Sequence, residues 1–170
     1  MDENFTTLEL DPTDLRLLDL LQADASRSNL ELAALVHVSP ATCLRRVKRL
    51  VEAGVIERRV ALLSVDKLGA GLTVLVEVSL DRQGAEALDA FEQRALAEGE
   101  VQQCYRVSPG PDFVLVVWAR DMPAYHALVQ RLFTADANVR NVKAYFSVKR
   151  AKFEPAMRMA PSAAPLSGAG

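Results

Sequence analysis

The chain has 170 residues, of which 50% are hydrophobic and 25% are charged, so it is long enough for one or two globular domains with their own cores. A formal net charge of only −2 argues against a protein that coats nucleic acid indiscriminately. No apolar stretch has the length of a signal peptide or a membrane span, so we expect a cytoplasmic protein with no membrane partner. The two cysteines, Cys43 and Cys104, lack metal-ligand spacing, which predicts reduced thiols without a metal or cofactor.

The amino-terminal part of the chain has the pattern of two short helices. Residues 1–9 carry no helix cap and are predicted to be flexible. A helix is predicted to begin at Asp11-Pro12-Thr13-Asp14. Its expected buried side chains are Leu15, Leu18 and Leu21. A second helix is predicted over residues 29–36, because Ser28 and Glu31 before it have capping-box spacing.

The third predicted helix is marked at both ends. Ser39 suits an N-cap, Pro40 the first helical position and Gly54 a left-handed C-cap. Only His37 and Val38 separate it from the second helix, and this spacing is typical of a helix-turn-helix. We interpret His37 as a turn residue with positive φ, not as a metal ligand or a base. Residues 10–54 are therefore predicted to form a DNA-binding domain.

The two sides of this third helix differ in chemistry. Apolar side chains at helical spacing predict its buried face: Cys43, Leu44, Val47, Leu50 and Val51. The opposite side is short, polar and cationic, which fits the major groove of double-stranded DNA better than it fits a merely solvated face. The predicted DNA-binding residues are Ser39, Ala41, Thr42, Arg45, Arg46, Lys48, Arg49, Arg58 and Arg59.

Different roles are expected within this set, although the sequence leaves open which residue reads a base. Ala41 and Thr42 are short enough to approach base edges. Arg45 and Arg49 can form forked hydrogen bonds to guanine or phosphate. The remaining cations are expected on phosphates.

The second half of the chain alternates strand and helix patterns. Residues 55–71 are predicted to be a wing or linker strand followed by a hinge, and residues 72–152 a domain in the order βαββαβ. Its expected strands are 72–80, 101–107, 113–119 and 139–148, the last with Val142, Ala144, Phe146 and Val148 inward. The fold class is therefore α+β, an N-terminal winged helix-turn-helix plus a C-terminal ferredoxin-like domain. Residues 153–170 are predicted to be a disordered tail.

The strand over residues 113–119 is apolar on both faces. Two helices can cover only one face of a four-stranded sheet, so the other face needs a partner. A second copy of the same sheet would supply it in a two-fold homodimer. The predicted dimer-interface residues are Val114, Val116 and Trp118. Such a dimer would present two recognition helices to a pseudo-palindromic site.

Three segments of the sequence resemble the feast/famine (Lrp/AsnC) family of bacterial and archaeal regulators. They are LDPTD at 10–14, SNLEL at 28–32 and VSPATCLRRVKRL at 38–50. The resemblance extends over residues 10–152. It implies homodimers, often assembled into octamers, and a small-molecule effector that is commonly an amino acid.

The family resemblance also implies an effector site in the second domain. The matching positions are Gly110, Asp112, Thr134, Tyr145, Phe146 and Ser147. Asp112 could meet an effector ammonium group. However, Pro109 and Pro111 replace residues whose backbone N–H groups would be available in the family, so a rigid turn without a ligand is an equally supported interpretation.

Three functions follow from these patterns. The first is a sequence-specific transcription regulator whose DNA binding responds to a small metabolite. The second is an architectural protein that wraps DNA through phosphates with little sequence preference. The third is an enzyme, since some tetrapyrrole decarboxylases resemble this family's fold. Catalysis is the least favoured, because the only histidines, His37 and His126, fall in different domains and no catalytic residues are predicted.

Overall fold

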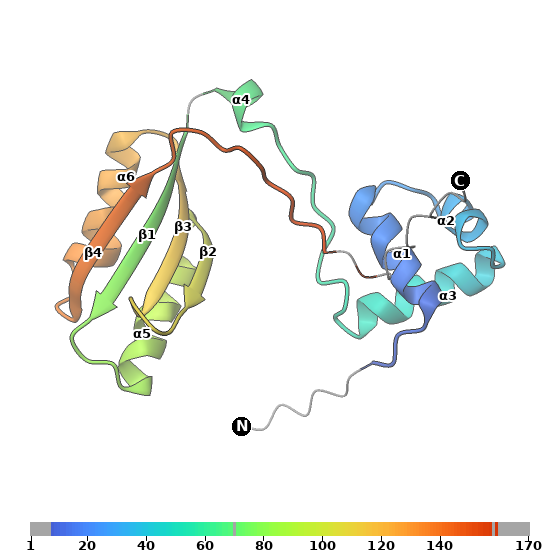
Figure 1. The fold of residues 1–170 in the computed structure, drawn as a ribbon, viewed down its shortest axis with the longest axis horizontal. Helices are drawn as coiled ribbons and strands as arrows, with labels where there is room; N and C mark the ends of the chain where they lie inside the picture. Colours follow the sequence, from blue (N-terminus) through green and yellow to red (C-terminus); the bar gives the residue numbers. More distant parts are fainter. Residues whose placement is uncertain (1–7, 70, 158, 160–170) are drawn as a thin grey trace, which may run out of the picture. The chain divides into compact units, whose positions relative to one another are not determined.

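The computed structural model describes residues 8–69, 71–157 and 159. The chain divides into a helical unit, within Met1–Leu62 and Phe153–Gly170, and a sheet unit, Leu63–Lys152 (Figure 1). Most of the predicted flexible amino terminus and most of the predicted disordered tail lie outside the described residues. None of the helices in the described ranges is long and apolar enough to cross a membrane.

The helical unit contains three helices with the predicted caps. They are α1 (Pro12–Ala23), α2 (Asn29–Leu35) and α3 (Pro40–Glu52). Asp11, Ser28 and Ser39 are the N-caps, and the capping box of Ser28 with Glu31 is present. His37 has φ 58°, which confirms the positive-φ turn between α2 and α3. Gly54 follows Ala53, the C-cap of α3, and has φ 71°, the left-handed conformation predicted for the end of this helix.

The core of this unit joins all three helices. It is formed by Leu17, Leu21, Leu32, Ala33, Val36, Cys43 and Val47. Leu17 is fully buried, whereas the predicted Leu15 is only half-buried. The prediction that Leu44 and Val51 are buried is wrong, because they are 59% and 47% exposed. At about 100° per residue, Leu44 lies about 95° and Val51 about 75° from the centre of the stripe formed by Cys43, Val47 and Leu50.

The strand predicted within residues 55–63 is not formed. Residues 57–64 have no regular secondary structure, and Val60, Leu62 and Leu63 are exposed. A strand needs a neighbouring strand for its backbone hydrogen bonds, and the described part of the helical unit contains none. A single helical turn, α4 (Val65–Leu68), follows in the region predicted to be a hinge.

The sheet unit has the predicted ferredoxin-like order. Its elements are β1 (Leu72–Leu80), α5 (Ala85–Ala97), β2 (Val101–Arg106), β3 (Phe113–Ala119), α6 (Met122–Leu128), the π-helical turn η1 (Val129–Thr134) and β4 (Val139–Phe146). The strands form one antiparallel sheet in the order β2-β3-β1-β4 (Figure 1). Asp121 caps α6, with Oδ1 accepting from the backbone N–H of Ala124 at 2.8 Å.

Helices α5 and α6 pack on one face of the sheet. Alternate residues of β1 and β3 form one core with Phe91 of α5 and with Tyr125 and Leu128 of α6. The prediction that Val142, Ala144 and Phe146 of β4 point inward is confirmed, because they lie opposite the buried Val78, Val76 and Val74 of β1, and the ring of Phe146 contacts that of Tyr125. Ala144 and Phe146 nevertheless remain exposed, and Val148 lies beyond the strand. The reason is that β4 is an edge strand and has a neighbour on one side only.

The opposite face of the sheet carries half-exposed apolar side chains. Val114, Val116 and Trp118 are half-buried on β3, and Leu75 beside them on β1 is 43% exposed. Tyr105 on β2 and Tyr145 on β4 extend this face toward both edges. We call the face formed by these six side chains the outer face.

Gly71 provides the space for Trp118 on the outer face. A Cβ atom at Gly71 would lie 2.6 Å from the indole Nε1 and 2.9 Å from Cε2. We therefore expect Gly71→Ala to displace the indole and to lower the free energy of unfolding by about 1–3 kcal/mol. Urea denaturation followed by the fluorescence of Trp118, the only tryptophan, measures both effects. Gly99→Ala is the control, because a Cβ there meets nothing within 4 Å; equal stability of the two variants would contradict the prediction.

The first residues after the sheet unit contact α1. The side-chain amide of Gln22 makes two hydrogen bonds to the backbone of Met157: Oε1 accepts at 2.8 Å and Nε2 donates at 2.7 Å. Asp19 Oδ1 accepts from the backbone N–H of Met159 at 2.8 Å. Residues 153–157 have no helix or strand, yet these contacts join the segment to the helical unit.

Candidate nucleic-acid interface and effector site

The start of α3 is held in place by a small set of hydrogen bonds. Ser39 Oγ accepts from the backbone N–H of Thr42 at 3.2 Å and lies 2.9 Å from Oγ1 of Thr42. Asn29 of α2 donates from Nδ2 to the carbonyl oxygen of Pro40 at 2.8 Å. The tip of α3, which carries Ala41 on its exposed side, is therefore fixed relative to α2.

The arginines of α3 have different surroundings. Arg45 is exposed, lies about 170° from the centre of the buried stripe and forms no ion pair with any described residue. Lys48 is also exposed, and its Nζ atom lies 3.6 Å from Oε1 of Glu52. Arg58 and Arg59 are exposed on the irregular segment after α3. Arg45 is thus the arginine of α3 that is most accessible to a ligand.

Arg46 and Arg49 instead contact the start of α1. Arg46 Nη1 lies 2.5 Å from Asp11 Oδ2 and 2.9 Å from Asp14 Oδ1. Arg49 Nη2 lies 2.5 Å from Asp14 Oδ2. We call these four residues the carboxylate clamp. Sequence reasoning predicted DNA contacts for both arginines but missed their carboxylate partners, which lie more than thirty positions away in the chain.

The electrostatics of the clamp follow from its hydrogen bonds. The backbone N–H of Asp14 and then the guanidinium of Arg46 lower the pKa of Asp11 below its usual range. Hydrogen bonds to Asp11 and then to Asp14 raise the pKa of Arg46. The side chain of Asp14 is fully buried, and a buried carboxylate is unfavourable unless it is paired. The guanidinium groups of Arg46 and Arg49 supply its two partners.

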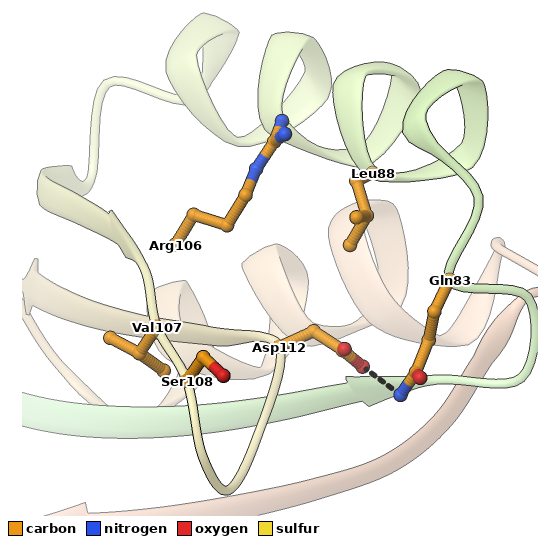
Figure 2. A pocket seen from close by; sticks show the side chains of 6 residues that line it. All are labelled: Gln83, Leu88, Arg106, Val107, Ser108 and Asp112. Carbon is orange, nitrogen blue, oxygen red and sulfur yellow. Dashed lines mark hydrogen bonds between the residues drawn. The ribbon is translucent and has the colours of Figure 1, made fainter.

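In the sheet unit, the turn between β2 and β3 borders a cavity of about 440 Å³ (Figure 2). Its lining residues are Gln83, Leu88, Arg106, Val107, Ser108 and Asp112. Asp112 Oδ2 accepts from the backbone N–H of Leu80 at 2.7 Å and from Gln83 Nε2 at 3.3 Å. This places an anionic oxygen pair at the end of β1.

Arg106 is the cationic residue in the wall of this cavity. Its Nη2 atom lies 2.6 Å from Asp89 Oδ1 and 2.7 Å from Glu92 Oε2, both on α5. The hydrogen bond to Asp89 is the main reason that its pKa is raised. Gly110 has φ 123° in the same turn but does not line the cavity. Since Arg106 is paired with two carboxylates, Asp112 is the charged lining residue without an ion pair among the described residues, which suits a ligand that carries an ammonium group.

The other predicted effector residues do not meet Asp112 within one copy of the chain. Asp112 is bonded through its backbone to Val78, whereas Phe146 pairs with Val74, about 13 Å further along β1. Tyr145 and Ser147 flank Phe146 at that end, and Ser147 borders a second cavity of about 440 Å³. Thr134 is exposed at the end of η1. One protomer thus supplies two separate groups of candidates.

Both cysteines are free, and neither has the surroundings of a reactive thiol. Cys43 is fully buried in the helical core, and burial raises the pKa of its thiol. Burial likewise raises the pKa of Cys104 on β2. A thiol with a raised pKa carries little of the reactive thiolate at neutral pH. Among the described residues, no group of three or more acids, cysteines and histidines has the arrangement of a metal site.

Two family profiles match the two units. One described as a winged helix-turn-helix DNA-binding domain matches residues 10–57, and one described as the Lrp/AsnC ligand binding domain matches residues 73–157. An uncharacterized HTH-type transcriptional regulator of Haemophilus influenzae is 38% identical over 84% of this chain and 85% of its own length. The leucine-responsive regulatory protein of Escherichia coli K12 is 34% identical over 85% of this chain and 88% of its own length.

A solved structure resembles this chain over nearly its whole length. It is a transcriptional regulator from Neisseria meningitidis in complex with L-Met, with a TM-score of 0.78 and 30% sequence identity. The match covers 88% of this chain and 96% of the other. The arrangement of a helix-turn-helix followed by a ferredoxin-like sheet is therefore shared with a regulator of known structure.

Proposed function

The chain belongs to the Lrp/AsnC family of transcriptional regulators, and we propose that it acts in the cytoplasm as a homodimer whose two α3 helices read double-stranded DNA. The single observation that carries this assignment of contacts is the exposed guanidinium of Arg45, which has no ion pair among the described residues and lies on the side of α3 opposite its core. Thr42 and Ala41 precede it on the same helix, where short side chains allow close approach to base edges.

Dimerisation through the outer face of the sheet is the second part of the proposal. Val114, Val116 and Trp118 are alternate residues of β3 on the same face of the sheet. The apolar surface continues onto the neighbouring strands through Leu75, Tyr105 and Tyr145. Pairing two such faces would bury these side chains and fix the distance between two recognition helices. Sedimentation velocity distinguishes this homodimer from the octamer that family membership also allows.

The third part of the proposal concerns a small effector, an amino acid or a relative of one. The Neisseria regulator with L-Met supports this class of ligand. In the cavity of Figure 2, Asp112 would pair with the ammonium group of the effector. Pro109 and Pro111 cannot donate backbone hydrogen bonds to the effector carboxylate, and Arg106 is already paired with Asp89 and Glu92, so recognition in this cavity would depend mainly on Asp112.

A thermal-shift screen of amino acids tests the effector. A true ligand at about 100 times its Kd stabilises the folded state by about 2.7 kcal/mol, which raises the Tm measurably. Asp112→Asn is expected to remove most of that shift, because it removes the charge that pairs with the ammonium group. Asp81→Asn is the control, since Asp81 is exposed near the same end of β1 but does not line the cavity. A shift that survives Asp112→Asn would place the ligand elsewhere.

DNA binding at fixed salt tests the regulatory role itself. We expect the wild-type protein to bind a duplex from its own promoter about 10³-fold more tightly than a random duplex, or better. A ratio near one would instead favour the architectural alternative, in which phosphate contacts dominate.

A further inference from the structure

The start of α1 supplies two carboxylates to two arginines of the proposed recognition helix. Asp14 accepts from Arg46 through Oδ1 and from Arg49 through Oδ2, and Asp11 accepts a second contact from Arg46. Asp14 also accepts from the backbone N–H of Asp11 at 3.2 Å, which completes the reciprocal capping box of α1. The arginine contacts and the helix cap are therefore one network.

The position of each arginine on α3 explains why only two of the three are held. Around the helix axis, Arg46 lies about 70° and Arg49 about 130° from the centre of the buried stripe, on the side that faces α1. Arg45 lies nearly opposite the core and out of reach of both carboxylates. The clamp thus divides the three arginines of α3 into two that are held by carboxylates and one that is accessible.

A guanidinium that is already paired with carboxylates gains less free energy from a contact with a DNA phosphate, because it must first give up those ion pairs. Arg46 is 24% exposed and has two carboxylate partners, whereas Arg49 is 44% exposed and has one. Since each DNA phosphate contact releases a counterion, holding these arginines lowers both nonspecific affinity and its dependence on salt.

We propose that Asp11 and Asp14 are specificity-determining positioning residues that hold Arg46, and in part Arg49, away from DNA phosphates. This inference rests on the proposed function and adds to it a reason for the weak nonspecific binding that a selective regulator needs. The carboxylates act through the arginines and do not touch DNA themselves. Arg46 then fixes the position of α3 against α1 through its ion pairs and does not contact the duplex.

Asp11→Asn is the variant that tests the proposal, because Asp11 is 45% exposed whereas Asp14 is fully buried. Binding to a random duplex is measured from low to moderate salt. Each additional phosphate contact steepens the slope of log K against log salt concentration by about 0.9. With one added contact per subunit, we expect the slope for the Asp11→Asn dimer to be steeper than that of wild type by about 1.8. The ratio of promoter to random affinity is expected to fall several-fold.

Glu9→Gln is the matched control. It removes the same charge two positions away, and Glu9 is exposed without an arginine contact among the described residues. Adding Arg46→Gln to Asp11→Asn is expected to reverse the steeper slope, while Arg46→Gln alone leaves the wild-type slope unchanged. Circular dichroism and Tm confirm that each variant is folded.

The possible results separate this inference from the proposed function. Wild-type protein that binds no duplex would contradict the proposed function and, with it, this inference. Wild-type protein that binds DNA, with the same salt slope in Asp11→Asn, Glu9→Gln and wild type, would overturn only the inference. A shallower slope in Arg46→Gln alone would overturn it as well, because Arg46 would then already contact phosphate.

Discussion

Arg45→Ala is expected to weaken binding to the promoter duplex by about 1–3 kcal/mol per subunit, if the guanidinium contacts a base edge. The reason is its place on α3, exposed and without an ion pair among the described residues. Loss of a base contact should also relax sequence preference at one position of each half-site. Fluorescence anisotropy with a set of single-base operator variants measures both effects.

Two variants give this prediction its controls. Arg140→Ala removes the same charge from an exposed position on β4 and should leave promoter affinity almost unchanged. Lys48→Ala should weaken promoter and random duplexes about equally, as expected for a phosphate contact. Arg45→Ala with wild-type affinity and unchanged base preference would show that another residue reads the DNA.

Val116→Asp is expected to convert the homodimer into monomers. Val116 lies at the centre of the outer face, beside Leu75 on one side and Gln103 on the other. A carboxylate there would have to be buried between two sheets without a partner, which is strongly unfavourable. Losing the second recognition helix removes avidity of about 10²–10⁴ in DNA affinity. Sedimentation velocity and promoter binding measure the two consequences.

Ala90→Asp is the matched control for this second prediction. Ala90 is exposed on α5, on the other side of the sheet, so the added charge does not meet the outer face. This variant should keep the mass and DNA affinity of wild type. A folded Val116→Asp protein that remains a dimer would show that the chain associates through a different surface.

Local patterns predicted the elements of this fold well because their causes are local. The caps at Asp11, Ser28 and Ser39 depend on residues within three positions, and the positive φ of His37 depends on the turn it occupies. The alternation of apolar residues along β3 likewise predicted two apolar faces, and the structure buries one and leaves the other half-buried.

The errors arose where partners distant in the chain decide the outcome. Residues 55–63 have strand-forming side chains but no neighbouring strand, so they stay irregular. Leu44 and Val51 satisfy a helical period yet sit at the margin of a stripe whose width is set by α1 and α2. β4 has the alternation of an inner strand but lies at the sheet edge.

The candidate site shows the same division. Periodicity predicted Arg45 and Arg49 on the polar side of α3 and Arg46 at its edge, and in the structure Arg45 and Arg49 are exposed whereas Arg46 is half-buried. Their different roles depend on Asp11 and Asp14, whose approach requires the packing of α1 against α3. A signal was present, since two acids at the start of one helix accompany an arginine-rich helix, but only the folded unit pairs them.

The most direct test of the central claim is a hydroxyl-radical footprint of the wild-type protein on its promoter. Two α3 helices carried by one homodimer should protect two half-sites on the same face of the duplex, about 34 Å or a multiple of it apart. Arg45→Ala should lose both protected patches together. A single patch, or uniform protection without a preferred position, would contradict a dimer that reads DNA through α3.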